Sequence, residues 1–101
     1  MSSFTVKPGV VLPPVLNLAV IVAEVMAAHS VQCVITSGVE GKHRADSLHY
    51  KDRGLDFRSR GQSLPLQELI AQQVRERLGP DYDFIVEGDH YHGEFDPKGQ
   101  R

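Results

Sequence analysis

The chain has 101 residues, of which 41% are hydrophobic and 24% charged, and its formal net charge is −2. This composition is typical of a soluble globular protein, and the length is that of one domain with one modest core. The absence of a positive excess argues against nucleic-acid binding by charge alone. We therefore expect a single domain over residues 1–101, a monomer without a nucleic-acid partner.

The most apolar segment runs from Leu16 to Ala28. It is shorter than the ~20 residues that a transmembrane helix needs, and Glu24 interrupts it. Two prolines precede it and Lys7 is the only basic side chain upstream, so it does not resemble a signal peptide. We expect a core helix, no membrane partner, and synthesis in the cytoplasm without a signal peptide.

The first half of the chain predicts one helix and one strand. Residues 1–14 are expected to form an irregular, proline-rich lead-in. From Val15 to about His29, apolar residues recur at helical spacing, which predicts a helix buried on most of its surface. The apolar, β-branched run at 31–36 predicts a central strand, in which the single cysteine, Cys33, is a buried core residue.

The second helix has signals at both of its ends. Ser63 is the expected N-cap, Pro65 lies in the first turn, and Gly79 and Pro80 end the helix. Before this helix, the polar segment 37–47 predicts a loop and residues 54–58 a short extended piece.

After the second helix, residues 83–87 and 90–95 predict two strands joined by a tight turn at 88–89. The tail, residues 97–101, is expected to be frayed. The order of elements is helix, strand, short strand, helix, strand, strand. It predicts an α+β fold with two helices and a small, mostly antiparallel sheet.

Four of the five histidines fall in two short clusters. In the first, His49 and Asp56 are seven residues apart, so a loop can bring both onto one metal ion. In the second, His90 and His92 are two apart on a predicted strand, and both side chains project from the same face. Catalytic zinc takes about three protein ligands, imidazoles and a carboxylate among them. The clusters predict a site for one zinc ion, with His90 or His92 as the third ligand.

The segment 47–56, SLHYKDRGLD, resembles the signature Ser-x-His-x-x-Gly-x-Ala-x-Asp of peptidase family M15. This family includes D-Ala-D-Ala dipeptidases and carboxypeptidases and the L-alanyl-D-glutamate endopeptidases of phage endolysins. It shares a zinc-site superfamily with lysostaphin-type enzymes and the hedgehog signalling domain. Ser47, His49 and Asp56 match, whereas Asp52 replaces the usual glycine and Gly54 the usual alanine. The resemblance implies a hedgehog/DD-peptidase-like fold in which His49 and Asp56 bind zinc.

The segment 89–94, DHYHGE, is similar to the His-x-His and the Asp/Glu-x-x-His-x-Glu of the same superfamily. The resemblance implies His92 as the third zinc ligand, Asp89 as the catalytic base and His90 as a second catalytic group beside the developing oxyanion. In a rival register, Glu87-x-x-His90, His90 is the ligand and Glu87 the base.

The resemblance also implies the activity. It is an endolysin-like, zinc-dependent peptidase that hydrolyses an amide bond of the peptidoglycan stem peptide or cross-link, acting at the cell wall or periplasm. Lys42, His43 and Arg44 either bind a carboxylate of the stem peptide or form a solvated loop. The competing interpretation is a non-catalytic zinc-binding module, or a virion-associated structural protein with the same fold. Asp89 and Glu87 favour catalysis, because a structural zinc site needs no acid beside it.

Overall fold

The computed structural model of the chain describes residues 4–10, 16–38 and 54–96. Within these residues, two helices and five strands form an α+β fold, as the sequence predicts. The helices are α1 (Leu16–Ala28) and α2 (Leu64–Leu78). The strands are β1 (Thr5–Val6), β2 (Val34–Ser37), β3 (Gly54–Arg58), β4 (Tyr82–Glu87) and β5 (His90–Phe95).

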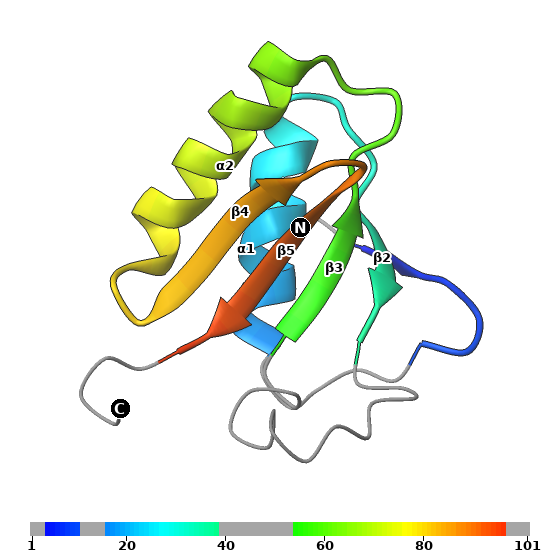
Figure 1. Ribbon diagram of the computed structural model, residues 1–101, viewed down its shortest axis with the longest axis horizontal. Coiled ribbons are helices and arrows are strands. Elements are labelled where there is room, and N and C mark those ends of the chain that lie inside the picture. The colour runs from blue at the N-terminus through cyan, green and yellow to red at the C-terminus, as the bar shows by residue number, and fades with distance from the viewer. Residues whose placement is uncertain (1–3, 11–15, 39–53, 97–101) are drawn as a thin grey trace.

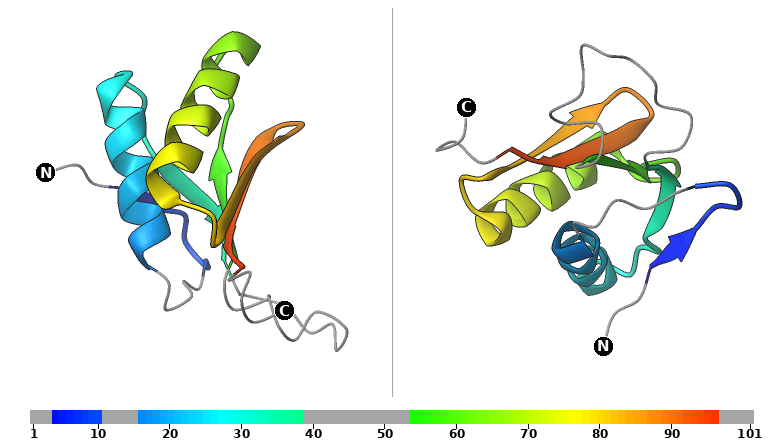
Figure 2. Two further views of the ribbon diagram at one scale, coloured as in Figure 1. Left: turned by 90° about the vertical axis from the view of Figure 1, so that its left-hand side faces the viewer. Right: turned by 90° about the horizontal axis from the view of Figure 1, so that it is seen from below.

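The five strands form one sheet in the order β1-β2-β3-β5-β4. Only the β1–β2 pair is parallel; the other three pairs are antiparallel. The middle strand is β3, while β2, the strand predicted as central, lies between β1 and β3. Both helices cover the same face of the sheet (Figures 1 and 2). We call the other face, which no helix of the described residues covers, the open face.

β1 lies within residues 1–14, for which the sequence predicts irregular structure, and this prediction is wrong for residues 5–6. The Thr5 N–H donates to the Cys33 carbonyl over 2.8 Å and the Lys7 N–H to the Ile35 carbonyl over 3.1 Å. A two-residue strand has no periodicity to detect. Its hydrogen-bonding partners are Cys33, just before β2, and Ile35 in β2, on the far side of α1 in the sequence.

The core lies between the helices and the sheet. α1 buries one face, whereas Val20 on the other is 43% exposed, so less of the helix is buried than predicted. Cys33 is buried as predicted, and burial raises its pKa to about 12. The sheet contributes three aromatic residues that are each at most 1% exposed, Phe57, Phe84 and Tyr91. The Phe84 and Tyr91 rings stack with their centroids 5.3 Å apart. The α1 residues exposed by no more than 1% are Leu18, Ala19, Val22, Ala23 and Met26.

α2 begins and ends where the sequence predicts. The Ser63 hydroxyl accepts a hydrogen bond from the Leu66 N–H over 3.3 Å, and Pro65 lies in the first turn. After Leu78, Gly79 adopts a φ of +89°, and its N–H donates to the Arg75 carbonyl. Both ends are therefore capped by the residues that local signals indicate.

β5 packs most closely against α1 at Gly93. A Cβ atom on this residue would lie 2.9 Å from Phe84 Cδ1 and 3.0 Å from Leu18 Cδ1. The glycine therefore lets the helix layer approach the sheet directly behind the histidines of β5. Neither α1 nor α2, the helices of the described residues, is long and apolar enough to cross a membrane.

Candidate metal centre

Strand alternation places the candidate residues on the open face. On β3, Leu55 and Phe57 are buried toward the helices, so Asp56 between them points outward. On β5, Tyr91 is buried in the same way, and its neighbours His90 and His92 point outward. The fold therefore presents the predicted acid and both histidines on one surface.

Asp56 and His92 lie directly opposite each other on β3 and β5. Residues paired in this way have Cβ atoms about 5 Å apart on the same face. The His92 Nδ1 atom is 2.7 Å from the Asp56 Oδ1 atom, a hydrogen bond between side chains 36 residues apart. The acid of the first motif and the second histidine of the His-x-His pair are thus in direct contact.

The second ring nitrogen of His92 also has a carboxylate partner. Nε2 lies 3.0 Å from Oε1 of Glu94, the next outward-facing residue of β5. The hydrogen bond with Asp56, then that with Glu94, raises the pKa of His92 from 6.5 to about 9, although partial burial acts the other way. At neutral pH and without a metal ion, His92 is therefore an imidazolium that donates to both carboxylates.

Glu94 has no role in the site that the sequence predicts. Its contact with His92 matters because a histidine that binds a metal usually donates its other ring N–H to a carboxylate or carbonyl. The i, i+2 spacing of His92 and Glu94 on a strand was the available signal, since it puts both side chains on one face.

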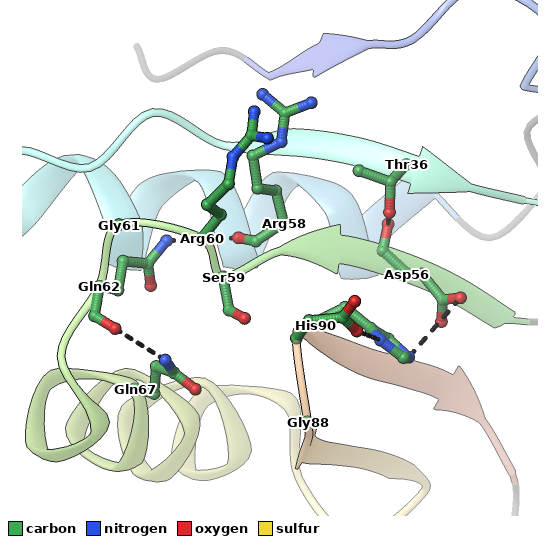
Figure 3. Close-up of a pocket in the computed structure, with 11 residues that line it drawn as sticks. Thr36, Asp56, Arg58, Ser59, Arg60, Gly61, Gln62, Gln67, Gly88 and His90 are labelled. Carbon is green, nitrogen blue, oxygen red and sulfur yellow. Dashed lines mark hydrogen bonds and ion pairs between the residues drawn. The ribbon is translucent and has the colours of Figure 1, made fainter.

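His90 lies among three acids at the end of the β4–β5 hairpin. Its Nδ1 is 2.9 Å from Asp89 Oδ1, and its Nε2 is 3.2 Å from Glu87 Oε1. The Asp56 Oδ2 atom is farther away, at 3.9 Å from Nε2 (Figure 3). These contacts, the hydrogen bond with Asp89 first, raise the pKa of His90 above its usual value. The same bond lowers the pKa of Asp89.

The two candidate bases differ in exposure. Asp89 lies in the two-residue turn, as predicted, and its side chain is 97% exposed. Glu87 is the last residue of β4, is paired with His90 across the hairpin, and has a side chain that is 47% exposed. Both acids therefore reach the same imidazole from different sides.

Part of the predicted site lies outside the described residues. The ligand His49 and its neighbour Ser47 belong to this part, as do the basic residues Lys42, His43 and Arg44 and the loop segment 39–47. The tail, residues 97–101, is outside as well.

The described donors fit a zinc ion in kind. A carboxylate oxygen and an imidazole nitrogen are both ordinary zinc ligands at about 2.0–2.1 Å, which puts two ligands of a tetrahedral ion about 3.3 Å apart. Asp56 and His92 would have to lose the proton between them and separate by about half an ångström. Gly54 leaves room for the ring, since a Cβ there would lie 3.2 Å from His92 Cε1.

A second group of possible ligands is purely acidic. Oxygen atoms of Asp83, Glu94 and Asp96 all lie within 4.8 Å of one another. In the part of the chain that the structure describes, this is the only group of at least three His, Cys, Asp or Glu side chains that approach so closely. Three carboxylates suit calcium or magnesium better than zinc.

Two pockets flank the Asp56–His92 pair. One, of about 520 Å³, lies beside the segment that links β3 to α2 and reaches Asp56 and His90 (Figure 3). The other, of about 800 Å³, is more apolar and lies against the β4 edge, where Tyr82, Ile85 and His92 contribute to its wall. A ligand centred on Asp56 and His92 would therefore meet a polar surface on one side and an apolar one on the other.

Comparison of the chain with protein-family models, with curated proteins and with solved structures finds no match. The metallopeptidase resemblance rests on the residues of the two motifs, and the zinc ion and the hedgehog-like form of the fold stay predictions.

Proposed function

We propose that the protein is an endolysin-like, zinc-dependent peptidase that hydrolyses an amide bond of the peptidoglycan stem peptide or cross-link. One zinc ion is bound by His49, Asp56 and His92. The observation that carries the proposal is the direct pairing of Asp56 with His92 across β3 and β5, with 2.7 Å between their side chains. A discontinuous metal site requires this meeting of an early and a late motif.

The contacts of His92 support it, rather than His90, as the ligand. Its Nδ1 faces Asp56, and its Nε2 faces Glu94, which would fix the ring with Nε2 protonated and Nδ1 free for the metal. The nearest His90 nitrogen is 3.9 Å from Asp56 and instead contacts Glu87. Glu94 is therefore proposed as the residue that orients the zinc ligand.

Zinc, when bound, lowers the pKa of a coordinated water toward neutrality and polarises the scissile carbonyl. Asp89 is the proposed base, and it transfers the proton to the leaving amine. Glu87, which contacts the same imidazole, is the alternative base, and its side chain is less exposed. His90, whose pKa is raised, keeps an N–H with which to stabilise the oxyanion.

Metal analysis tests the site independently of catalysis. Purified protein equilibrated with zinc should hold about one ion per chain, and His49→Ala, Asp56→Ala and His92→Ala should each lose it. His29→Asn is the matched control, because His29 hydrogen-bonds Gln73 between the helices, away from the open face. Folded wild-type protein that takes up no zinc refutes the proposal.

Incubation with purified peptidoglycan tests catalysis. Zinc-loaded wild type should release new amino termini. We expect Asp89→Asn to lower the rate by about 10²–10⁴-fold at unchanged zinc content if Asp89 is the base. A loss of that size in Glu87→Gln alone assigns the base to Glu87. If zinc-loaded wild type releases no new amino termini, the protein is instead a non-catalytic zinc-binding module.

A further inference from the structure

The pocket beside the link between β3 and α2 has two chemically different ends. Asp56, Asp89 and His90 lie at the end next to the candidate metal centre, and Arg58 and Arg60 lie at the other. Gln62 and Gln67 line the pocket near the start of α2 (Figure 3). The pocket adjoins the candidate metal centre, but neither the metal nor the proposed proton transfers use its basic end.

The basic end consists of the two arginines, Arg58 and Arg60. In the view of Figure 3, both guanidinium groups extend away from Gln67, toward the side of β3 where β2 lies. There they also line a shallower pocket with Gln32 and Val34. Among the described residues, no acid forms an ion pair with either arginine. Two arginines that line one pocket favour a carboxylate ligand, because a guanidinium group can bind a carboxylate through two parallel hydrogen bonds.

Gln67 supplies an independent sign that a ligand binds here. The residue is only 9% exposed, and its Nε2 donates to the Gln62 carbonyl over 2.8 Å. Its Oε1 is buried and has no hydrogen-bond partner, the one such side-chain atom in the described part of the chain. This oxygen is turned away from Gln62, toward the side of Gly88 and His90 (Figure 3). Buried acceptors nearly always have a donor, so the missing one is expected from outside the chain.

The chain segment that carries these groups is held in place. Gln62 Nε2 donates to the Arg58 carbonyl over 3.3 Å, and Gln62 Oε1 accepts a hydrogen bond from the Tyr91 hydroxyl over 2.5 Å. Tyr91 is fully buried in the core. The pocket wall is therefore fixed to the core before any ligand arrives, which lowers the entropy cost of binding.

We propose that this pocket binds a peptide residue that bears a free carboxylate. Arg58 and Arg60 hold the carboxylate after their long side chains turn toward Gln67, and a neighbouring amide N–H supplies the donor for Gln67 Oε1, directly after a small rotation of the glutamine side chain or through one water. Arg58 and Arg60 set the direction of the ligand, because they line the pocket at the end away from the candidate metal centre. The role as a substrate subsite rests on the proposed peptidase function, whereas the binding itself does not.

Binding of small peptides to the whole chain tests the pocket, with and without zinc. The probe is N-acetyl-alanyl-alanine, in the L and D series, followed by NMR titration or calorimetry. Replacing the carboxylate by a carboxamide, or making Arg58→Gln or Arg60→Gln, should weaken binding about tenfold or more. Arg77→Gln is the matched control, since Arg77 pairs with Glu24 on the helices, and it should bind as wild type does. Thermal unfolding checks that each variant is folded.

The donor to Gln67 is tested by a cycle of ligand and protein changes. Methylation of the peptide nitrogen between the two alanines should weaken binding to wild type about tenfold, but binding to Gln67→Met less than twofold. The proposal is overturned if neither parent probe shows saturable binding. It is also overturned if the carboxamide probe and the arginine variants leave the binding affinity unchanged. An equal effect of methylation in both proteins overturns the role of Gln67. If the protein binds the probe but never cleaves peptidoglycan, the peptidase proposal fails and the binding pocket stands. If it cleaves peptidoglycan but the arginine variants bind the probe as wild type does, the pocket proposal fails and the peptidase proposal stands.

Discussion

The imidazolium of His92 couples protein stability to pH, and this coupling can be predicted in sign and size. The pKa of His92 is raised in the folded protein from 6.5 to about 9, mainly by the hydrogen bond with Asp56. A group whose pKa is raised on folding contributes stability that is fully present below its unfolded pKa. That stability is lost as the pH rises through the folded pKa. Zinc-free protein should therefore lose stability between about pH 6.5 and pH 9.

The size follows from the rise of the His92 pKa from 6.5 to about 9, at about 1.4 kcal/mol for each pH unit, which sets a ceiling of about 3–4 kcal/mol. The His92 side chain is 33% exposed, so solvent screens part of this energy, and we expect about 1–2 kcal/mol. The difference should appear in urea unfolding of zinc-free wild type at a series of pH values. His92→Asn should lack this component of the pH dependence, and the remaining slope then belongs to other groups such as His90.

The same proton competes with zinc. With a pKa of about 9, the proton should lower the apparent zinc affinity at pH 7 by about 100-fold relative to the deprotonated site. Zinc affinity should rise with pH until about pH 9 and then level off. A wild type and a His92→Asn variant with the same pH dependence of unfolding would refute the assigned hydrogen bonds. A zinc affinity that does not change between pH 7 and pH 9 would do the same.

Three further predictions concern stability. Gly93→Ala should lower Tm by about 5–20 °C in calorimetry, because the new Cβ would lie 2.9 Å from Phe84 Cδ1. Overpacking of this kind costs about 1–3 kcal/mol, and an unchanged Tm would contradict the packing described for Gly93. Ser63→Ala should cost about 1 kcal/mol in urea unfolding through the lost N-cap, and a change below a few tenths would mean that the cap is not formed in solution. Glu24→Gln should change the free energy of unfolding by less than about 0.5 kcal/mol, since both it and its partner Arg77 are exposed, and a loss above about 1 kcal/mol would show a stronger ion pair.

Elements with local signals could be predicted from the sequence almost to the residue. α2 has Ser63 before it and Gly79 after it, and both residues act on the backbone within one helical turn. The turn at 88–89 is likewise set by its own residues, Gly88 having a φ of +52°. In such cases the structure is determined by neighbours in the sequence, which a single chain displays directly.

Features that depend on distant partners were harder to predict. β1 is defined by two hydrogen bonds to residues beyond α1, and nothing within residues 4–10 indicates them. The residue clusters alone brought Asp56 together with either His90 or His92, and only the motif resemblance favoured His92, since strand register cannot be read from either segment alone. The role of Glu94 and the unpaired oxygen of Gln67 became visible only with side-chain positions.

β5 separates two tasks within six residues. Its inward residues, Tyr91 and Gly93, hold the core together, and its outward residues, His90, His92 and Glu94, carry the candidate chemistry. Substitutions on the open face can therefore alter ligand preference while the core stays intact. A single residue inserted or deleted within β5 would exchange the two sets of side chains beyond that point and disrupt fold and site together. β5 therefore tolerates the replacement of an outward side chain better than a change in its number of residues.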